Sequence, residues 1–440
     1  MFTSLVVIAL LPLAGAVAQM PSILPAQDSL RPITLDEAVE LARRNNPAAV
    51  QARGQTRTTS SAVRSAYGAF LPSLSGSMRQ QKQGGQRFDP LRGPVAQPGS
   101  AWQYSMGFSS SLELFDGGRR FAELRAARAD VDAAEANEVT QSFSIAFQVK
   151  REYSNILAAR ESESAARAQL QQAEAQLAAA VARVQAGAAT MSDSLRSLIQ
   201  VGNARLALMT AQNNVRVASA SLTRLVGTPF TVTANPADTA ELLIAAVDSA
   251  ALASLVLQGP AVTQAERNTA AARAGEWAAK SSYLPTISAS FNYNGNRQDS
   301  SYRVSFGPYA YGRSFTVSMQ VPIFNNFNRE DQVLRARVAR DNADAQLRDA
   351  RLAAQQSFVQ QFGALRTAEA RIRIQQASVL AADEDLRVMQ QRYNLGASTL
   401  LDLLTSQSQL NQARADLIQA RQDYRIARAQ IEAIIGRDLN

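Results

Sequence analysis

The chain contains two copies of one structural unit, and this duplication limits its possible folds more than any other feature. Pro47 recurs as Pro260, and Leu71 recurs as Leu284, in both cases 213 residues further along. Three later landmarks recur at a spacing of 209 residues: Phe115 as Phe324, Gly187 as Gly396 and Gly227 as Gly436. Since each spacing holds across separated landmarks, the second copy lacks four residues between its two strand segments and otherwise keeps register.

Each copy contains two segments in which apolar and polar residues alternate. We predict strands near residues 71–80, 102–115, 284–294 and 313–324. One apolar face is formed by Trp102, Tyr104, Met106, Phe108, Leu112 and Leu114, and the second copy repeats it with Phe315, Val317, Met319, Val321 and Ile323. A β-sandwich gives the same alternation. The crowding of aromatic residues at strand ends and the small polar residues opposite favour a membrane barrel.

Each copy also contains a very long helical segment followed by a shorter one. Residues 119–186 contain neither Gly nor Pro, and residues 328–395 contain only Gly363. Each run of about 68 residues predicts a helix roughly 100 Å long. Two heptad stripes predict that it packs against a returning helix: Leu365, Ile372, Val379, Leu386, Tyr393 and Leu400 on one side, and Leu403, Leu410, Leu417, Tyr424 and Ile431 on the other. The shorter helices are expected over 190–226 and 399–435.

Composition argues against catalysis. The chain has no His and no Cys, so thiolate metal sites, disulfides and a lipid-modified cysteine are excluded. We predict no enzyme, no cofactor and no bound metal. The net charge of +8 comes from Arg residues spread along helices among Asp and Glu, so no nucleic-acid partner is expected. The loop from Lys82 to Ser100 is rich in Gly and Pro and is expected to be exposed at the cell surface.

These patterns divide the chain into four parts. Residues 1–18 are predicted to be a signal peptide, because an apolar run precedes Ala16-Val17-Ala18. The first repeat covers 19–227, a linker or equatorial segment covers 228–258, and the second repeat covers 259–440. Four strands cannot close a barrel, for which about eight are needed. An open edge in lipid leaves unpaired backbone groups. Two, three or four copies of the chain could therefore complete one barrel.

The sequence resembles the TolC family of outer-membrane efflux proteins over nearly the whole chain after residue 18. The resemblance is carried by the duplication and by six motifs: Leu71-Pro72, Leu284-Pro285, Phe115-Asp116-Gly117-Gly118, the segment 321–326, and the Gly187…Asp193 and Gly396…Asp402 turns. It implies a mainly α protein with a membrane β-barrel: a homotrimer whose 12-stranded barrel continues as an α-helical barrel across the periplasm. Its implied function is a passive exit duct that spans the outer membrane and the periplasm and exports substrates delivered by a pump and an adaptor, in multidrug efflux or type I secretion. Its implied partners are outer-membrane lipid, a periplasmic adaptor (membrane fusion) protein and an inner-membrane pump of the RND, ABC or MFS type.

Candidate functional residues fall into three groups. The resemblance places Asp402 and Asp193 at the periplasmic entrance, and the helix-hairpin tips that contact the adaptor at Gly187, Ala188, Thr190, Gly396, Ala397 and Thr399. Girdle candidates are Trp102, Tyr104, Tyr283, Tyr293, Tyr309 and Tyr311. Each group also has a local interpretation, namely helix capping for the tips and strand packing for the aromatics.

Two points bear on how the entrance is interpreted. A tightly closing family member has a second Asp and a basic residue where this chain has Thr405 and Ser398, so a double carboxylate ring is not expected. The alternative function, from a different class, is a periplasmic coiled-coil structural or adaptor protein.

Overall fold

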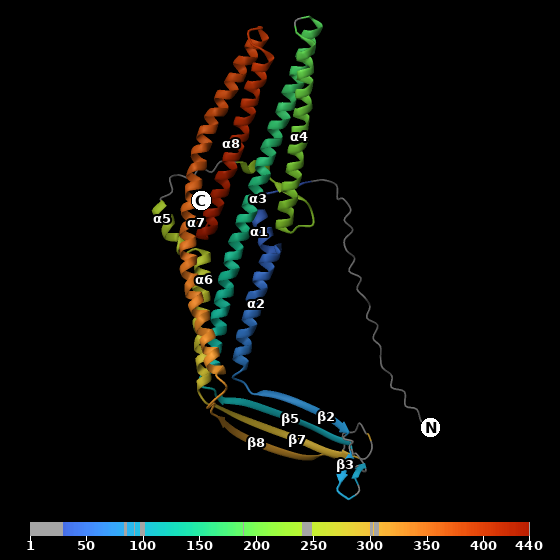
Figure 1. The fold of residues 1–440 in the computed structure, drawn as a ribbon, viewed down its shortest axis with the longest axis vertical. Coiled ribbons are helices and arrows are strands. Elements are labelled where there is room, and N and C mark those ends of the chain that lie inside the picture. The colour runs from blue at the N-terminus through green and yellow to red at the C-terminus, as the bar shows by residue number, and fades with distance from the viewer. Residues whose placement is uncertain are drawn as a thin grey trace, which may run out of the picture.

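A four-stranded sheet occupies one end of the molecule, and long helices run from it to two separate hairpin tips (Figure 1). The computed structural model describes residues 30–82, 86–91, 93–96, 102–187, 189–239, 249–299, 302 and 308–439. The predicted signal peptide and Ala188 lie outside these residues.

The two repeats contain the same main elements in the same order. The first has α1 (Leu35–Asn45), α2 (Pro47–Gly68), β2 (Ser73–Lys82), β5 (Trp102–Phe115), α3 (Arg119–Gln185) and α4 (Met191–Val226). The second has α5 (Ser249–Val256), α6 (Pro260–Lys280), the 3-10 turn η2 (Ser281–Tyr283), β7 (Thr286–Asp299), β8 (Ala310–Gln320), α7 (Asn328–Asn394) and α8 (Leu400–Ile435). α3 and α7 each have 67 residues, and α4 and α8 each have 36.

The sheet is antiparallel, in the order β2-β5-β7-β8. Its register places small polar residues side by side on one face: the Ser73 and Ser111 hydroxyls lie 2.8 Å apart, and those of Ser288 and Ser318 lie 2.9 Å apart. The other face is apolar across all four strands and includes Leu74, Met78, Met106, Phe108, Leu112, Ala289, Phe291, Phe315, Val317 and Met319. We call these two surfaces the hydroxyl face and the apolar face.

Two sequence expectations about the sheet need correction. A bulge between Glu113 and Phe115 makes Phe115, and not Leu114, pair with Ile287 on the apolar face. The segment expected to be a plain loop contains a small hairpin, because β3 (Gln86–Asp89) pairs with β4 (Gly93–Ala96).

The helices stand side by side as a wall. Near the sheet, the neighbours run in the order α2, α3, α6, α7; towards the tips, the order is α4, α3, α8, α7. The predicted heptad stripes join α7 to α8, since Leu386, Leu400, Leu403 and Leu410 form one buried cluster. No described helix is long and apolar enough to span a membrane.

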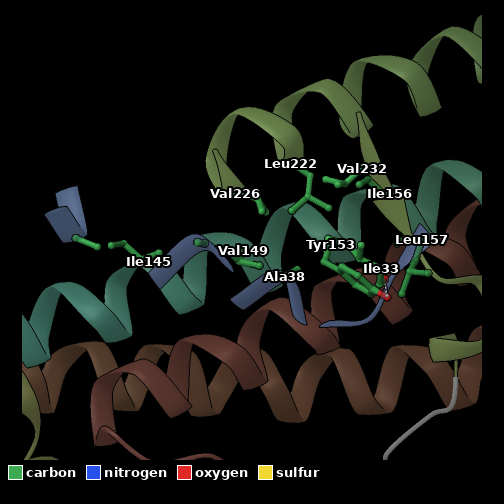
Figure 2. Close-up of a cluster of buried hydrophobic side chains, with 13 residues drawn as sticks. Ile33, Ala38, Ile145, Val149, Tyr153, Ile156, Leu157, Leu222, Val226 and Val232 are labelled. Carbon is green, nitrogen blue, oxygen red and sulfur yellow. Dashed lines mark hydrogen bonds between the residues drawn. The ribbon is translucent and has the colours of Figure 1, made fainter. Parts of the chain in front are cut away.

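The largest buried cluster among the described residues joins the first repeat at mid-height, where α2 begins and α4 ends (Figure 2). Ile145, Val149 and Tyr153 of α3 meet Leu222 and Val226 of α4 in this cluster. The parallel pair of β1 (Arg31–Ile33) and β6 (Val232–Ala234) lies against it, followed by the short 3-10 turn η1 (Pro236–Thr239). Burial and a hydrogen bond to Asp238 raise the pKa of the Tyr153 hydroxyl. This core fixes β6, which lies in the segment expected to be a linker, against the long helices.

Candidate functional site: channel wall, hairpin tips and membrane surface

The two hairpin tips have matching backbone geometry. Gly187 and Gly396 adopt φ of 73° and 74°, the left-handed region that glycine tolerates best. Each follows a helix directly, and the amide of Gly396 donates to the carbonyl of Tyr393 at 3.1 Å. The amide of Ala397 donates to the Arg392 carbonyl at 2.8 Å. These bonds satisfy carbonyls that the helix end leaves open, so the tips are compact turns.

Asp402 caps the returning helix α8 and is exposed at the tip. Its Oδ2 accepts from the Thr399 amide at 2.9 Å and from the Thr399 hydroxyl at 2.8 Å, while Thr399 Oγ1 accepts from the Asp402 amide at 3.2 Å. This reciprocal capping box holds the pKa of Asp402 below its usual range, chiefly through the Thr399 amide and hydroxyl, with a smaller contribution from the charge of Arg392.

Asp193 occupies the same place in the first hairpin. Its Oδ2 accepts from the Thr190 amide at 3.3 Å and from the Thr190 hydroxyl at 2.9 Å. The hydrogen bond from the Thr190 amide to Asp193 is longer than the matching hydrogen bond from the Thr399 amide to Asp402. The predicted tip residues thus lie together at two turns, with the carboxylates of both hairpins used as helix caps.

Arg183 joins the two hairpins and was not identified by sequence reasoning. It lies in the last turn of α3, and its guanidinium is 4.6 Å from the ring centroid of Tyr393 on α7. The same guanidinium donates to the Tyr393 carbonyl at 3.4 Å and to Asn394 Oδ1 at 3.1 Å. The only signal in the sequence was a basic residue four positions before Gly187 and an aromatic residue three positions before Gly396.

Four of the six girdle candidates, Trp102, Tyr104, Tyr309 and Tyr311, lie at the end of the sheet away from the helices, where β5 and β8 begin, and Tyr293 lies near the middle of β7. Tyr293 stacks on Tyr311 with ring centroids 5.3 Å apart, and Tyr309 lies 6.1 Å from Tyr311. Trp102 packs against Tyr302 at 4.8 Å. Tyr104 is buried, so it packs within the sheet end more than it projects outward. These residues form the distal aromatic cluster.

Tyr283 lies at the opposite end of the sheet, in η2, with the Arg329 guanidinium 5.0 Å from its ring centroid. Other aromatic side chains that sequence reasoning did not single out lie near the same junction between strands and helices. Phe70 and Phe121 meet edge to face at 5.0 Å, and Phe324 and Phe327 do so at 5.4 Å. We call these four residues the junction belt.

The two strand-to-helix junctions are built differently. At the first, the Asp116 carboxylate accepts from the amides of Gly118 at 3.2 Å and Arg120 at 3.0 Å, and from Arg120 Nε at 2.8 Å. Both side chains of that ion pair are buried. The N-cap residue itself is Gly118, so Asp116 caps α3 from two positions earlier.

The second junction carries backbone strain. Asn326 and Phe327 have φ of 57° and 62°, where the first junction has Gly117 and Gly118 at 67° and 81°. A bulky residue in the left-handed region costs about 1–2 kcal/mol. Phe327 is nevertheless 69% exposed, so burial within this chain does not offset the cost.

The family model of outer membrane efflux proteins matches the chain twice, over residues 38–228 and 252–437, once for each repeat. The chain therefore belongs to the outer membrane efflux protein family, whose members are channels of the outer membrane that reach into the periplasm. Membership in this family favours a channel over the alternative of a periplasmic adaptor.

Three comparisons define the likeness further. Protein CyaE of Bordetella pertussis is 28% identical over 420 residues, covering 92% of this chain and 83% of that protein. The pyoverdine export outer membrane protein OpmQ of Pseudomonas aeruginosa is 25% identical over 338 residues, covering 76% of this chain and 68% of OpmQ. The solved structure of VceC from Vibrio cholerae superposes with a TM-score of 0.74 at 17% identity, covering 92% of this chain and 97% of VceC. The last likeness shows a shared fold.

Proposed function

We propose that three copies of this chain form a passive exit duct: a closed 12-stranded barrel in the outer membrane, continued by a 12-helix tunnel. The family forms trimers and works with adaptors and inner-membrane pumps. In the duct, an inner-membrane pump supplies the energy, a periplasmic adaptor docks at the hairpin tips, and cargo moves through the lumen without covalent chemistry.

One observation carries the proposal: sheet and helical wall both end in unpaired edges on the same two sides. β2 and β8 are the edge strands of the four-stranded sheet. α2 and α4 end the wall on the β2 side, and α7 ends it on the β8 side. Because edge strands in lipid must be paired, β2 of one copy pairs with β8 of the next, and the two run antiparallel.

The exposed side chains of the wall edge support the same closure. An apolar stripe at three- and four-residue spacings follows α4 and includes Met191, Leu195, Leu198, Leu206 and Met209, each more than half exposed. This spacing is typical of a helix that packs against another helix. The exposed Leu352, Val359 and Ile374 on α7 provide an apolar partner surface on the neighbouring copy.

The hydroxyl face lines the barrel lumen in this assembly, because the apolar face must meet lipid. Its side chains are Ser, Thr, Asn and Gln apart from Arg79, Glu113 and Ala310, and Glu113 is paired with Arg119 at 2.9 Å. Such a lining holds water and discriminates little by charge, which suits a general duct. Relatives named for pyoverdine export and for antibiotic efflux are 25–28% identical to this chain, so the cargo is open between such classes.

If the duct selects cargo by charge, this selection takes place at the periplasmic entrance. Three copies of Asp402 converging at the tips would form a carboxylate ring, which favours cations. Arg183 ties the first hairpin to the second and so holds the tips of each copy together. We propose that these contacts set the closed entrance and that the adaptor contacts Gly187, Ala188, Thr190, Gly396, Ala397 and Thr399.

Disulfide cross-linking tests the closure, because the natural chain has no Cys. Ser77→Cys combined in turn with Ser314→Cys, Thr316→Cys and Ser318→Cys should give covalent dimers and trimers for at least one pair. The control is Ser109→Cys with Asn292→Cys, whose positions pair within one sheet and should cross-link only inside a chain. A monomer that retains its β-sheet signal in mild detergent and gives no cross-linked oligomer with any pair would overturn the proposal.

A further inference from the structure

On β7 the apolar face of the sheet is too short to span the outer membrane by itself, although on β5 it reaches from Trp102 to Phe115. On β7 it runs from Ile287 to Gly295, eight residues further along. At ~3.3 Å per residue and a tilt of about 40°, that length covers roughly 20 Å along the barrel axis. The apolar band of an outer-membrane barrel is about 25 Å tall. Arg313, opposite Tyr293 on this face, shortens the purely apolar part further.

The missing height lies at the junction between strands and helices. Phe121, Phe324 and Phe327 of the junction belt are each about two-thirds exposed, and so is Leu71; Ile323 is almost fully exposed. Phe327 keeps its aromatic ring at a left-handed backbone position where the first repeat has Gly118. A strained residue with an exposed ring indicates that the ring meets something outside the chain.

The belt faces the lipid side of the wall. Glu113 lies on the hydroxyl face and binds Arg119, so that side of α3 continues the lumen. Phe121 follows two residues later, about 200° further round the helix, and therefore faces outward. Phe115, the last residue of β5, lies on the apolar face opposite Ile287, so the outward surface is continuous from strand to helix.

Trp277 lies on the same outer side, one turn above the sheet. On α6, Thr269 and Glu276 bind α7, and Gln264 binds α3. Trp277 follows Glu276 and therefore lies about 100° further round α6, between the sides that meet α7 and α3. Because the α-helix is right-handed, this position is on the outer side of the wall, the side on which Phe121 also lies. Trp277 is 65% exposed. The equivalent position in the first repeat, 213 residues earlier, is the exposed Arg64 on α2.

We propose that Trp277 and Arg64 bind the phospholipid headgroups of the inner leaflet of the outer membrane, with the junction belt in the hydrocarbon just beyond them. This inference rests on the proposed membrane barrel. Trp277 is three residues from the end of α6 and Arg64 is four from the end of α2, or ~5 Å along each helix. The headgroup layer is about 5–8 Å deep on each side of the bilayer. Around the proposed trimer, Trp277 and Arg64 would alternate. The indole of Trp277 favours the membrane–water interface, and the guanidinium of Arg64 binds phosphate.

Fluorescence of single-tryptophan variants tests the depth of Trp277, because the chain has only two tryptophans, Trp102 and Trp277. Trp102→Phe and Trp277→Phe each leave one of them. Both variants are reconstituted into vesicles of phosphatidylethanolamine and phosphatidylglycerol whose acyl chains carry bromine near the glycerol or at mid-chain. We expect bromine near the glycerol to quench Trp277 more strongly than mid-chain bromine, and aqueous iodide to quench it weakly.

The Trp102 signal separates two kinds of failure. If bromolipids quench Trp102 while Trp277 responds only to iodide, the barrel is inserted and the headgroup inference is wrong. If neither tryptophan responds to bromolipids, the membrane barrel fails and this inference fails with it.

Arg64 is tested by the lipid that the trimer retains. Native mass spectrometry of trimers extracted from the same vesicles should show about five-fold weaker retention of phosphatidylglycerol in Arg64→Glu than in the natural chain. The matched control is Arg57→Glu, two helical turns further from the sheet on the same helix, which should retain the natural amount. Equal retention in both variants would remove Arg64 from the proposed site.

Discussion

The two repeats share their dimensions but differ in their stabilising contacts. α3 matches α7 and α4 matches α8 residue for residue in length, and both hairpins turn at a left-handed glycine and restart at a Thr–Asp capping box. Between the membrane-proximal helices the contacts diverge. In the second repeat, Glu276 is buried among Lys280, Arg337 and Arg340. The equivalent first-repeat positions include Val63 and Val131.

In the proposed duct, the two repeats must agree in some properties and can differ in others. Helix length and turn position set where the helical wall begins and ends, so a change in either repeat would misalign neighbouring copies of the proposed assembly. Contacts between adjacent helices need only hold the same spacing. A buried ion pair can replace an apolar pair without altering wall geometry, provided its charges are matched.

The junctions should show the largest difference in stability. Asp116→Ala leaves buried Arg120 without its counterion and removes two amide caps, and we expect a loss of about 3 kcal/mol or more. Asn325→Ala at the second junction removes one weak cap, Asn325 Oδ1 to the Arg329 amide at 3.4 Å, and should cost about 1 kcal/mol or less. The measurement is the urea midpoint of the helical circular dichroism signal in detergent. Equal shifts of the urea midpoint in the two variants would mean that the buried Asp116–Arg120 ion pair adds nothing to stability.

The glycines of the first junction should be less replaceable than their counterparts. A Cβ on Gly117 would lie 2.3 Å from Cβ of Leu284, and its φ is positive. Gly117→Ala should therefore cost about 2 kcal/mol. Asn326→Gly at the equivalent position should gain about 1 kcal/mol or less, because it relieves a left-handed asparagine. Both are compared by the same urea midpoints. A stable Gly117→Ala would show that Leu284 can move away.

Sequence predicted the long elements well, because their determinants are local. A run without Gly or Pro defines α3, a run interrupted only by Gly363 and carrying a heptad stripe defines α7, and the Thr–x–x–Asp spacing defines the starts of α4 and α8. Gln320 ends β8 earlier than expected, since Pro322 soon after it has no amide to donate.

Other features depend on partners distant in sequence. The bulge that replaces Leu114 by Phe115 on the apolar face follows from the register with β7. The contact of Arg183 with Tyr393 joins residues 210 positions apart. The outward position of Trp277 follows from which faces of α6 meet α3 and α7. Local spacing encodes none of these, so sequence reasoning missed Arg183 and Trp277.

Breaking the contact between the hairpins tests whether the two tips act together. Arg183→Ala removes a cation–π contact and two hydrogen bonds, and a loss of about 1 kcal/mol would shift the ratio of open to closed entrances about five-fold. The measurement is single-channel conductance in planar bilayers. Arg387→Ala is the control, because Arg387 pairs with Glu384 on its own helix. If both variants conduct alike, the contact does not restrain the entrance.

The smallest expected effect separates the two capping carboxylates. If Asp402 only caps α8, Asp402→Asn keeps an oxygen acceptor for the Thr399 amide and leaves ion selectivity nearly unchanged. If three copies converge on the axis, removing the charge lowers cation selectivity at pH 7 in planar bilayers. Asp193→Asn is the matched control, because Asp193 has the same spacing from its threonine in the other hairpin.

The pH dependence sharpens that comparison. The Thr399 donors stabilise the charged carboxylate of Asp402, so its pKa is lowered and its charge is lost only as the pH falls below the usual range for Asp. The natural duct should therefore keep the same cation selectivity at pH 5 as at pH 7, and Asp402→Asn should be less selective at both. Equal, small changes in Asp402→Asn and Asp193→Asn would leave both residues as helix caps, and the entrance would then owe any cation selectivity to other groups.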